Sequence, residues 1–156
     1  MHGLRFATLL ALLGAIACSG STSDIPPTTQ QTSILLRSDA LIAGYGCGVG
    51  DGQVYKYSVS LLPPSDSKQT AIGAVVDCFA DAKFTQLAAS ASGLPFTLKV
   101  HAFRAADYAK AEVQIRASAA IADTIALDGL ATWKTTCEAT QQPSVTVLAL
   151  CPDPLR

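Results

Sequence analysis

Apolar and polar residues alternate with a period of two along several short stretches of the chain. Between Tyr55 and Leu61, aromatic or aliphatic residues alternate with one lysine and two serines. This period is typical of a β-strand that buries only one of its two faces. The stretch therefore predicts a strand with Tyr55, Tyr57, Val59 and Leu61 pointing inward and the serines pointing outward.

The same alternation recurs in later segments that are separated by turn signals rich in Pro, Gly, Ser and Asp. The expected strands lie within residues 71–84, 94–103, 131–140 and 144–151, and the last of these is a continuous apolar run. Within the second segment, Phe96, Leu98, Val100 and Ala102 are expected to point inward. Several short alternating strands separated by turns predict an all-β fold, an antiparallel β-sandwich of immunoglobulin-like or prealbumin-like type.

The segment from residue 105 to residue 125 fits two patterns at once. Its alanine content favours a helix. However, apolar residues also alternate along its second half, at Val113, Ile115, Ala117, Ala119 and Ile121. We expect a short helical turn over Ala105–Lys110 and a strand from about Glu112.

One part of the chain resembles known sandwich modules. The stretch from Gly73 to Tyr108, which begins GAVVDCFADAKF and ends LPFTLKVHAFRAADY, resembles the strand-turn-strand run of prealbumin-like and immunoglobulin-like modules in bacterial surface proteins. The resemblance implies a sandwich fold. It carries no catalytic residue.

The N-terminal segment has the three parts of a secretory signal. Arg5 supplies a positive charge, residues 6–17 form an apolar block, and small residues close that block. The block is shorter than the roughly 20 apolar residues that a membrane-spanning helix needs. Residues 1–17 are therefore expected to be a signal peptide.

Cys18 directly follows the small residues. Ala15-Ile16-Ala17-Cys18 resembles the lipobox of bacterial lipoproteins, with Ala15 in place of the usual leucine. The resemblance implies that Cys18 is lipidated and anchors the chain to the membrane, and Ser19 implies sorting to the outer membrane. Ordinary signal peptidase would cut at the same bond and leave a soluble secreted ligand-binding protein.

Residues 19–33 are small, polar or Pro apart from one isoleucine, and cannot bury enough apolar surface to order themselves. Residues 18–33 are thus expected to be the lipidated cysteine and a disordered tether, and residues 34–156 one sandwich domain. The 11 basic and 12 acidic residues form no basic cluster, which argues against nucleic acid as a partner.

Four cysteines remain in the expected domain: Cys47, Cys78, Cys137 and Cys151. An even number in an exported protein predicts two disulfides. Of the three possible pairings, Cys47 with Cys78 and Cys137 with Cys151 close the shortest loops. The spacing contains no Cys-x₂-Cys pair, which argues against zinc.

Few residues are candidates for chemistry. Alternating glycines in GYGCGVGDG, residues 44–52, lack the spacing of a phosphate loop and indicate close backbone approach around Cys47. Asp51 is a single carboxylate and does not by itself make a calcium site. Asp77 and Asp81 would lie about 13 Å apart on an extended strand, which is more than paired-carboxylate glycoside hydrolysis uses.

His101 is the one histidine outside the leader, and we expect it on a solvated strand face. Trp133, Tyr55 and Tyr57 are expected in the core rather than at a ligand surface. The sequence therefore predicts a lipid-anchored envelope module without catalysis, metal or cofactor, which binds an envelope protein or glycan or has a structural role. The main alternative is an envelope hydrolase that uses His101 with an Asp and a Ser.

Overall fold

Two β-sheets form the body of the protein. The structure is a computed structural model that describes residues 31–90, 92–117, 127–152 and 155. In chain order its elements are β1 (Gln31–Leu36), α1 (Ser38–Leu41), β2 (Lys56–Leu62), β3 (Ile72–Asp77), β4 (Ala82–Ala88), β5 (Phe96–Phe103), α2 (Ala105–Ala117), β6 (Trp133–Ala139) and β7 (Thr146–Leu148).

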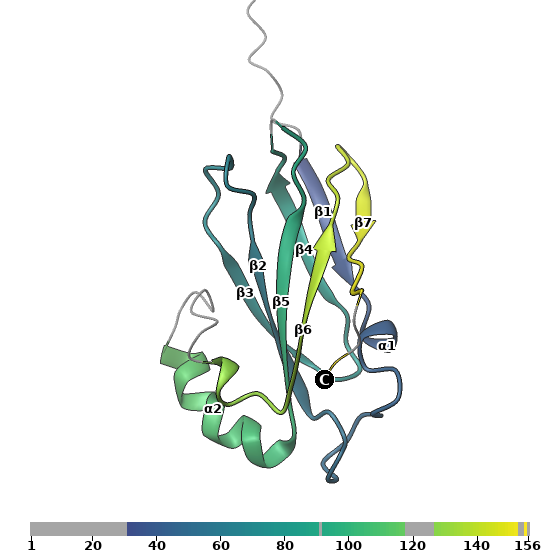
Figure 1. Ribbon diagram of the computed structural model, residues 1–156, viewed down its shortest axis with the longest axis vertical. Coiled ribbons are helices and arrows are strands. Elements are labelled where there is room, and N and C mark those ends of the chain that lie inside the picture. Colours follow the sequence, from purple (N-terminus) through teal and green to yellow (C-terminus); the bar gives the residue numbers. More distant parts are fainter. Residues whose placement is uncertain (1–30, 91, 118–126, 153–154, 156) are drawn as a thin grey trace, which may run out of the picture.

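The sheets have the strand orders β4-β1-β7 and β3-β2-β5-β6 (Figure 1). The neighbouring strands are antiparallel except for β1 and β7, which run parallel. The predicted all-β sandwich is confirmed.

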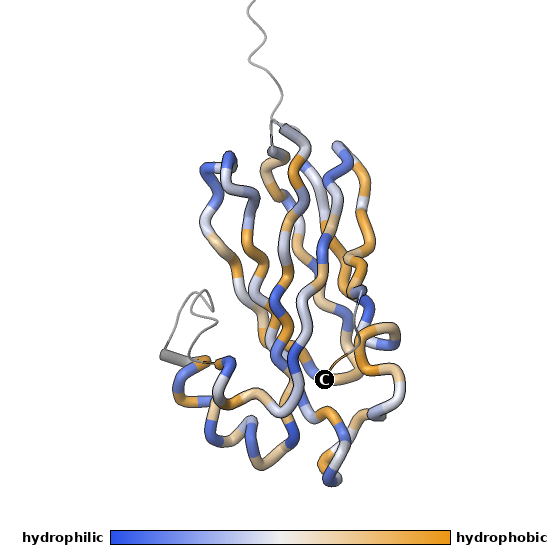
Figure 2. The backbone as a smooth tube through the Cα atoms, in the orientation of Figure 1, coloured by the Kyte–Doolittle hydropathy of each residue, from blue (hydrophilic) through white to orange (hydrophobic). Residues whose placement is uncertain are grey.

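The core lies between the two sheets, where alternate side chains of each strand meet. Figure 2 shows apolar and polar positions alternating along the strands. The inward residues expected on β5 are confirmed, because Phe96, Leu98, Val100 and Ala102 are all buried. The three-stranded sheet contributes to the same core Ile34, Leu36, Phe84 and Leu87.

Strand β1 spans Gln31–Leu36, so residues 31–33, which the sequence assigns to the tether, are part of this strand. Gln31 pairs with Ala88 of β4, and Ser33 pairs with Thr146 of β7. These polar residues are held by backbone hydrogen bonding on both sides of the strand, which composition alone does not reveal. The leader and Cys18 lie outside the described residues. Among the described helices, none is long and apolar enough to span a membrane.

Helix α2 extends to Ala117, so residues 112–117 are helical and the strand expected there is wrong. The rest of the expected strand lies outside the described residues. Ala111 and Ile115 are four residues apart and therefore lie on one face of the helix. Both are buried in a second apolar cluster with Phe103 and Leu127. Helical spacing and alanine propensity thus outweigh the alternating pattern.

This second cluster lies on the outer face of the four-stranded sheet, at one end of the sandwich (Figure 1). Next to it, Ser58 of β2 is fully buried, although the alternation predicted that it faces solvent. Its cross-strand neighbours are Val75, which packs against the cluster, and His101. Helix α2 and the segment of Leu127 therefore form a second layer that covers the outer face of the four-stranded sheet here.

The two ends of the sandwich differ. β1 begins at one end, and the other end carries α1, α2 and the glycine-rich loop (Figure 1). Both disulfides have the favoured pairing, Cys47 with Cys78 and Cys137 with Cys151. The first joins the glycine-rich loop to the turn between β3 and β4, and the second joins β6 to the C-terminal segment.

Candidate functional site

The candidate acidic residues of the sequence have different partners. Asp77 forms an ion pair with Lys56, whose Nζ lies 2.7 Å from Oδ1 of Asp77. Asp81 accepts hydrogen bonds from the backbone N–H and the hydroxyl of Ser38, at 2.8 and 3.2 Å. Asp51 is exposed in the glycine-rich loop. Among the described residues, no group of three or more His, Cys, Asp or Glu side chains is placed to hold a metal ion.

The aromatic candidates have different environments. Tyr57 is fully buried, as expected, and its hydroxyl donates a hydrogen bond to the carbonyl of Ala80. Trp133 is half-buried, and the centroid of its ring lies 4.8 Å from that of Tyr45. Tyr55 is also half-buried and meets Tyr108 of α2 edge to face. Only Tyr57 is therefore a full core residue.

The glycine-rich loop has the close backbone contacts that its sequence predicts. The backbone N–H groups of Gly48 and Val54 donate to the carbonyls of Val54 and Gly46, each at 3.0 Å. Gly46 has a φ of 68°, in the left-handed region that favours glycine. This geometry presents Cys47 to Cys78.

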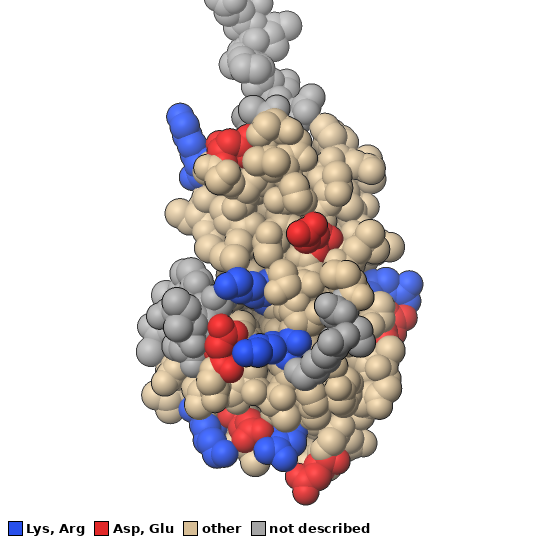
Figure 3. Space-filling model, in the orientation of Figure 1, with Lys and Arg blue, Asp and Glu red and all other residues tan. Residues whose placement is uncertain are grey.

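His101 is buried, so the expected solvated histidine is wrong. Its exposed fraction is 1%, and its Nε2 lies 2.8 Å from Oδ1 of Asp128. The side chain of Asp128 is 44% exposed, and both residues line a hollow of about 320 Å³ with Lys99 and Lys134. Basic and acidic side chains gather on this face of the molecule (Figure 3). The hydrogen bond from His101 is the largest of the effects that lower the pKa of Asp128.

Ser58, His101 and Asp128 have the residue types of a catalytic triad. Ser58 Oγ and His101 Nδ1 are both buried and have no hydrogen-bond partner among the described residues. The hydroxyl is therefore neither activated by the imidazole nor open to a substrate. The contact between His101 and Asp128 joins the segment around residues 127–131 to the sheet. This contact joins residues 27 positions apart and has no local sequence signal.

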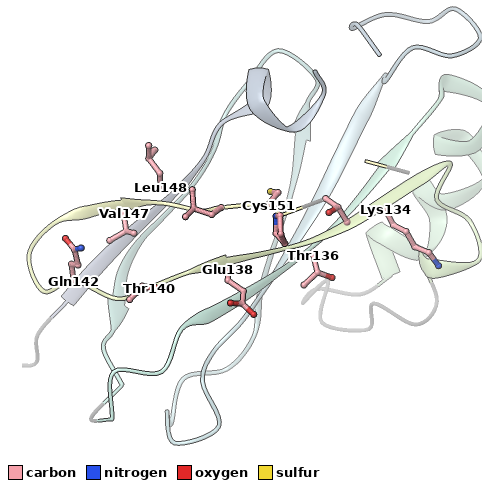
Figure 4. Close-up of a pocket in the computed structure, with 11 residues that line it drawn as sticks. Lys134, Thr136, Glu138, Thr140, Gln142, Val147, Leu148 and Cys151 are labelled. Carbon is pink, nitrogen blue, oxygen red and sulfur yellow. The ribbon is translucent and has the colours of Figure 1, made fainter. Parts of the chain in front are cut away.

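A groove of about 900 Å³ runs along the open side of the sandwich. One wall is β6 and its continuation, and the other is β7 with the C-terminal segment that follows it (Figure 4). The polar lining residues include Lys134, Thr136, Glu138, Thr140 and Gln142, and the apolar ones include Val147, Leu148 and Leu150. A few polar groups among apolar walls are typical of binding sites.

The groove forms because the two arms of the C-terminal hairpin belong to different sheets. Glu138 and Leu150 exchange two backbone hydrogen bonds of 2.9 and 2.8 Å, beside the disulfide of Cys137 and Cys151. Beyond that point β6 stays with β5, whereas β7 pairs with β1. The sequence predicted strands on both sides of the groove and the disulfide between Cys137 and Cys151, but not the groove. A continuous apolar run indicates burial on both faces, yet Leu150 is 72% exposed.

Comparison of the chain with protein-family models, with curated proteins and with solved structures finds no match. Its function is therefore inferred from its own residues and their geometry.

Proposed function

We propose that this chain is an envelope lipoprotein, a β-sandwich held at the outer membrane by lipid on Cys18, which binds a partner without catalysing a reaction. The cysteine count carries the proposal. Two disulfides use four of the five cysteines, so Cys18 has no cysteine partner within the chain. A thiol directly after a signal-like leader is then available for lipid.

The distance between Cys18 and the sandwich supports an anchoring role. Twelve residues, from 19 to 30, separate Cys18 from Gln31. A flexible chain of this length spans on the order of 20 Å, and an extended one about 40 Å. The end of the sandwich at which β1 begins would face the membrane. The end with α1, α2 and the glycine-rich loop would point away from it.

The groove between β6 on one side and β7 with the C-terminal segment on the other is the proposed binding surface. Its walls come from two different sheets, and the disulfide of Cys137 and Cys151 holds them together at one end. The groove is therefore preformed, which lowers the entropic cost of binding. Its hydroxyl, amide and carboxylate groups beside exposed leucines suit a protein segment or a glycan of the envelope.

Radiolabelled palmitate tests the anchor. Cells that express the full chain are grown with the label, and the purified protein is compared with a Cys18→Ser variant. We expect label on the unaltered protein and none on the variant. Equal labelling of both proteins, or no label on either, would contradict lipidation at Cys18.

Two matched variants test the groove. Leu150 lines it, Val113 lies on α2, and the two side chains are each 72% exposed. We expect Leu150→Ser to weaken binding of the purified protein to isolated envelope proteins or to peptidoglycan at least tenfold. Val113→Ser should leave this binding unchanged. Equal effects of the two variants would argue against the groove as the binding surface.

A hydrolase is the second candidate, because the fold brings Ser58, His101 and Asp128 together. The burial of Ser58 Oγ and its lack of a hydrogen bond to the imidazole weigh against this activity. A screen of ester, amide and glycoside substrates decides between the two functions. If a substrate is turned over by the unaltered protein but not by a correctly folded His101→Ala variant, the protein is a hydrolase and the binding proposal is wrong.

A further inference from the structure

Phe79 is the most exposed large apolar side chain of the described residues, at 82%. It lies in the turn between β3 and β4, at the end of the sandwich opposite the start of β1 (Figure 1). An aromatic ring in water contributes little to folding, whereas aromatic rings are frequent anchors of protein interfaces. The ring of Phe79 is therefore a candidate anchor for a protein interface.

The backbone on both sides of Phe79 is fixed from within the fold. Cys78 precedes it and is bonded to Cys47 of the glycine-rich loop. Ala80 follows it, and its carbonyl accepts a hydrogen bond from the buried hydroxyl of Tyr57. A covalent bond and a core hydrogen bond thus hold the two neighbours of the exposed ring.

A third contact comes from the start of α1. The hydroxyl of Ser38 donates to the carbonyl of Phe79 at 3.3 Å and also lies 3.2 Å from Oδ1 of Asp81. Ser38 is buried, so these bonds lie beneath the turn. The turn is consequently rigid, although the side chain at its tip is free in solvent.

A second apolar side chain accompanies Phe79. Val49 is 75% exposed and lies two residues after Cys47, whose Cα is 5.6 Å from that of Cys78. The disulfide therefore keeps the two loops side by side. Val49 also borders a hollow of about 370 Å³ that Tyr55 and Tyr108 line. Lys56 and Glu112 line the same hollow, so the surface beside Val49 is mixed toward α2.

Carboxylates border this surface. Asp51 follows Val49 in the glycine-rich loop, and Asp77 and Asp81 lie on either side of the turn of Phe79. One cation, Lys56, is paired with Asp77. Three carboxylates and one ammonium group give a local charge of about −2, which repels anionic lipid and attracts basic residues. We call Val49, Phe79, Asp51, Asp77 and Asp81 the acidic knob.

We propose that the acidic knob docks into an apolar pocket, bordered by lysine or arginine, on another protein of the cell envelope. The ring of Phe79 fills the pocket and the carboxylates meet its basic rim. The rigid turn reduces the ordering cost of binding. The direction of the knob, away from the membrane, rests on the proposed lipid anchor. The knob surface itself does not depend on that anchor.

Photocrosslinking in the native host tests the docking. p-Benzoylphenylalanine replaces Phe79 in the full chain, and a matched chain carries it at Val113, which is 72% exposed on α2. After irradiation, mass spectrometry identifies the adducts. We expect a discrete protein adduct from position 79 that is absent from position 113. The same adducts from both positions, only lipid adducts, or only a second copy of this chain would overturn the proposal.

The binding strength of the purified adduct partner then tests the chemistry. By calorimetry, we expect Phe79→Ser to weaken binding at least 30-fold and Val113→Ser less than twofold. Ser38→Ala loosens the turn without changing the knob surface and should weaken binding by about three- to tenfold. Higher salt should also weaken it. An unchanged affinity of Phe79→Ser, with an unchanged unfolding midpoint, would overturn the proposal.

Palmitate labelling of the same cells separates this inference from the proposed function. Label on Cys18 without an adduct from position 79 would contradict docking by the acidic knob and still support the lipid anchor. An adduct from position 79 without label would support the knob and overturn the anchor.

Discussion

The disulfide between Cys47 and Cys78 holds the acidic knob together and also closes the longer of the two covalent loops. The perturbation is its removal in a double variant, Cys47→Ala with Cys78→Ala. The bridged residues are 31 positions apart, against 14 for Cys137 and Cys151. A longer loop restricts the unfolded chain more, so its removal should cost more stability.

The loop lengths set the expected magnitudes. The chain-entropy relation gives about 4 kcal/mol for the Cys47–Cys78 loop and about 3 kcal/mol for the Cys137–Cys151 loop. Domains of this size are stable by roughly 5 to 15 kcal/mol. Each double variant should therefore remain folded with a lower unfolding free energy. Removal of both bridges, at a cost of about 7 kcal/mol, should leave a large unfolded fraction.

Urea unfolding measures these differences. Trp133 is the one tryptophan of the chain and packs against Tyr45 in the folded state, so its fluorescence reports unfolding. The matched control is the Cys137→Ala, Cys151→Ala variant. An equal loss in the two double variants, or a loss below about 1 kcal/mol for the longer loop, would refute the loop-entropy reasoning. In either case, effects in the folded state would dominate the contribution of the bridge.

Three further substitutions test the described contacts. Hydrogen bonds, first from Arg104, lower the pKa of Asp107 to about 2 from 3.8. Because the pKa of Asp107 is lower in the folded than in the unfolded protein, its ionisation stabilises the fold above pH 3.8, and this stability is lost as the pH falls toward 2. The Asp107→Asn variant should lack this pH dependence of the unfolding free energy, measured by urea unfolding from about pH 2 to 6. Tyr57→Phe leaves the carbonyl of Ala80 without its partner and should cost about 1 to 3 kcal/mol in urea unfolding. Leu98→Ala should cost about 2 to 5 kcal/mol by the same measurement, because the side chain is fully buried. Unchanged curves for any of the three variants would contradict the corresponding contact.

Alternation predicts the strands well where one face of a strand meets the core. Along β5 the inward residues are those that the sequence indicates, from Phe96 to Ala102. The alternating pattern fails to predict burial where a second layer of the protein covers the outward face of a strand. Ser58 and His101 have the pattern of solvated positions, but they are buried beside α2 and the segment of Asp128. Such cover depends on contacts between distant residues, which local patterns do not encode.

The candidate sites show the same limit. Loop length alone suggested both disulfides, because cysteines close in the chain have a high chance of meeting. The groove and the acidic knob required the fold. The groove depends on β7 leaving β6 to pair with β1, and the knob depends on the bridge that joins the loop of Val49 to the turn of Phe79. Neither feature has a motif in the sequence.

The intact mass of the mature protein, purified from the membranes of its host, tests the central proposal most directly. Lipoprotein processing and ordinary secretion would both cut before Cys18, so the two differ in the mass of the first residue. We predict a chain that begins at Cys18 and is heavier than its bare polypeptide by the mass of attached acyl chains. A mass equal to that of the bare polypeptide would contradict the anchor and favour a secreted ligand-binding protein.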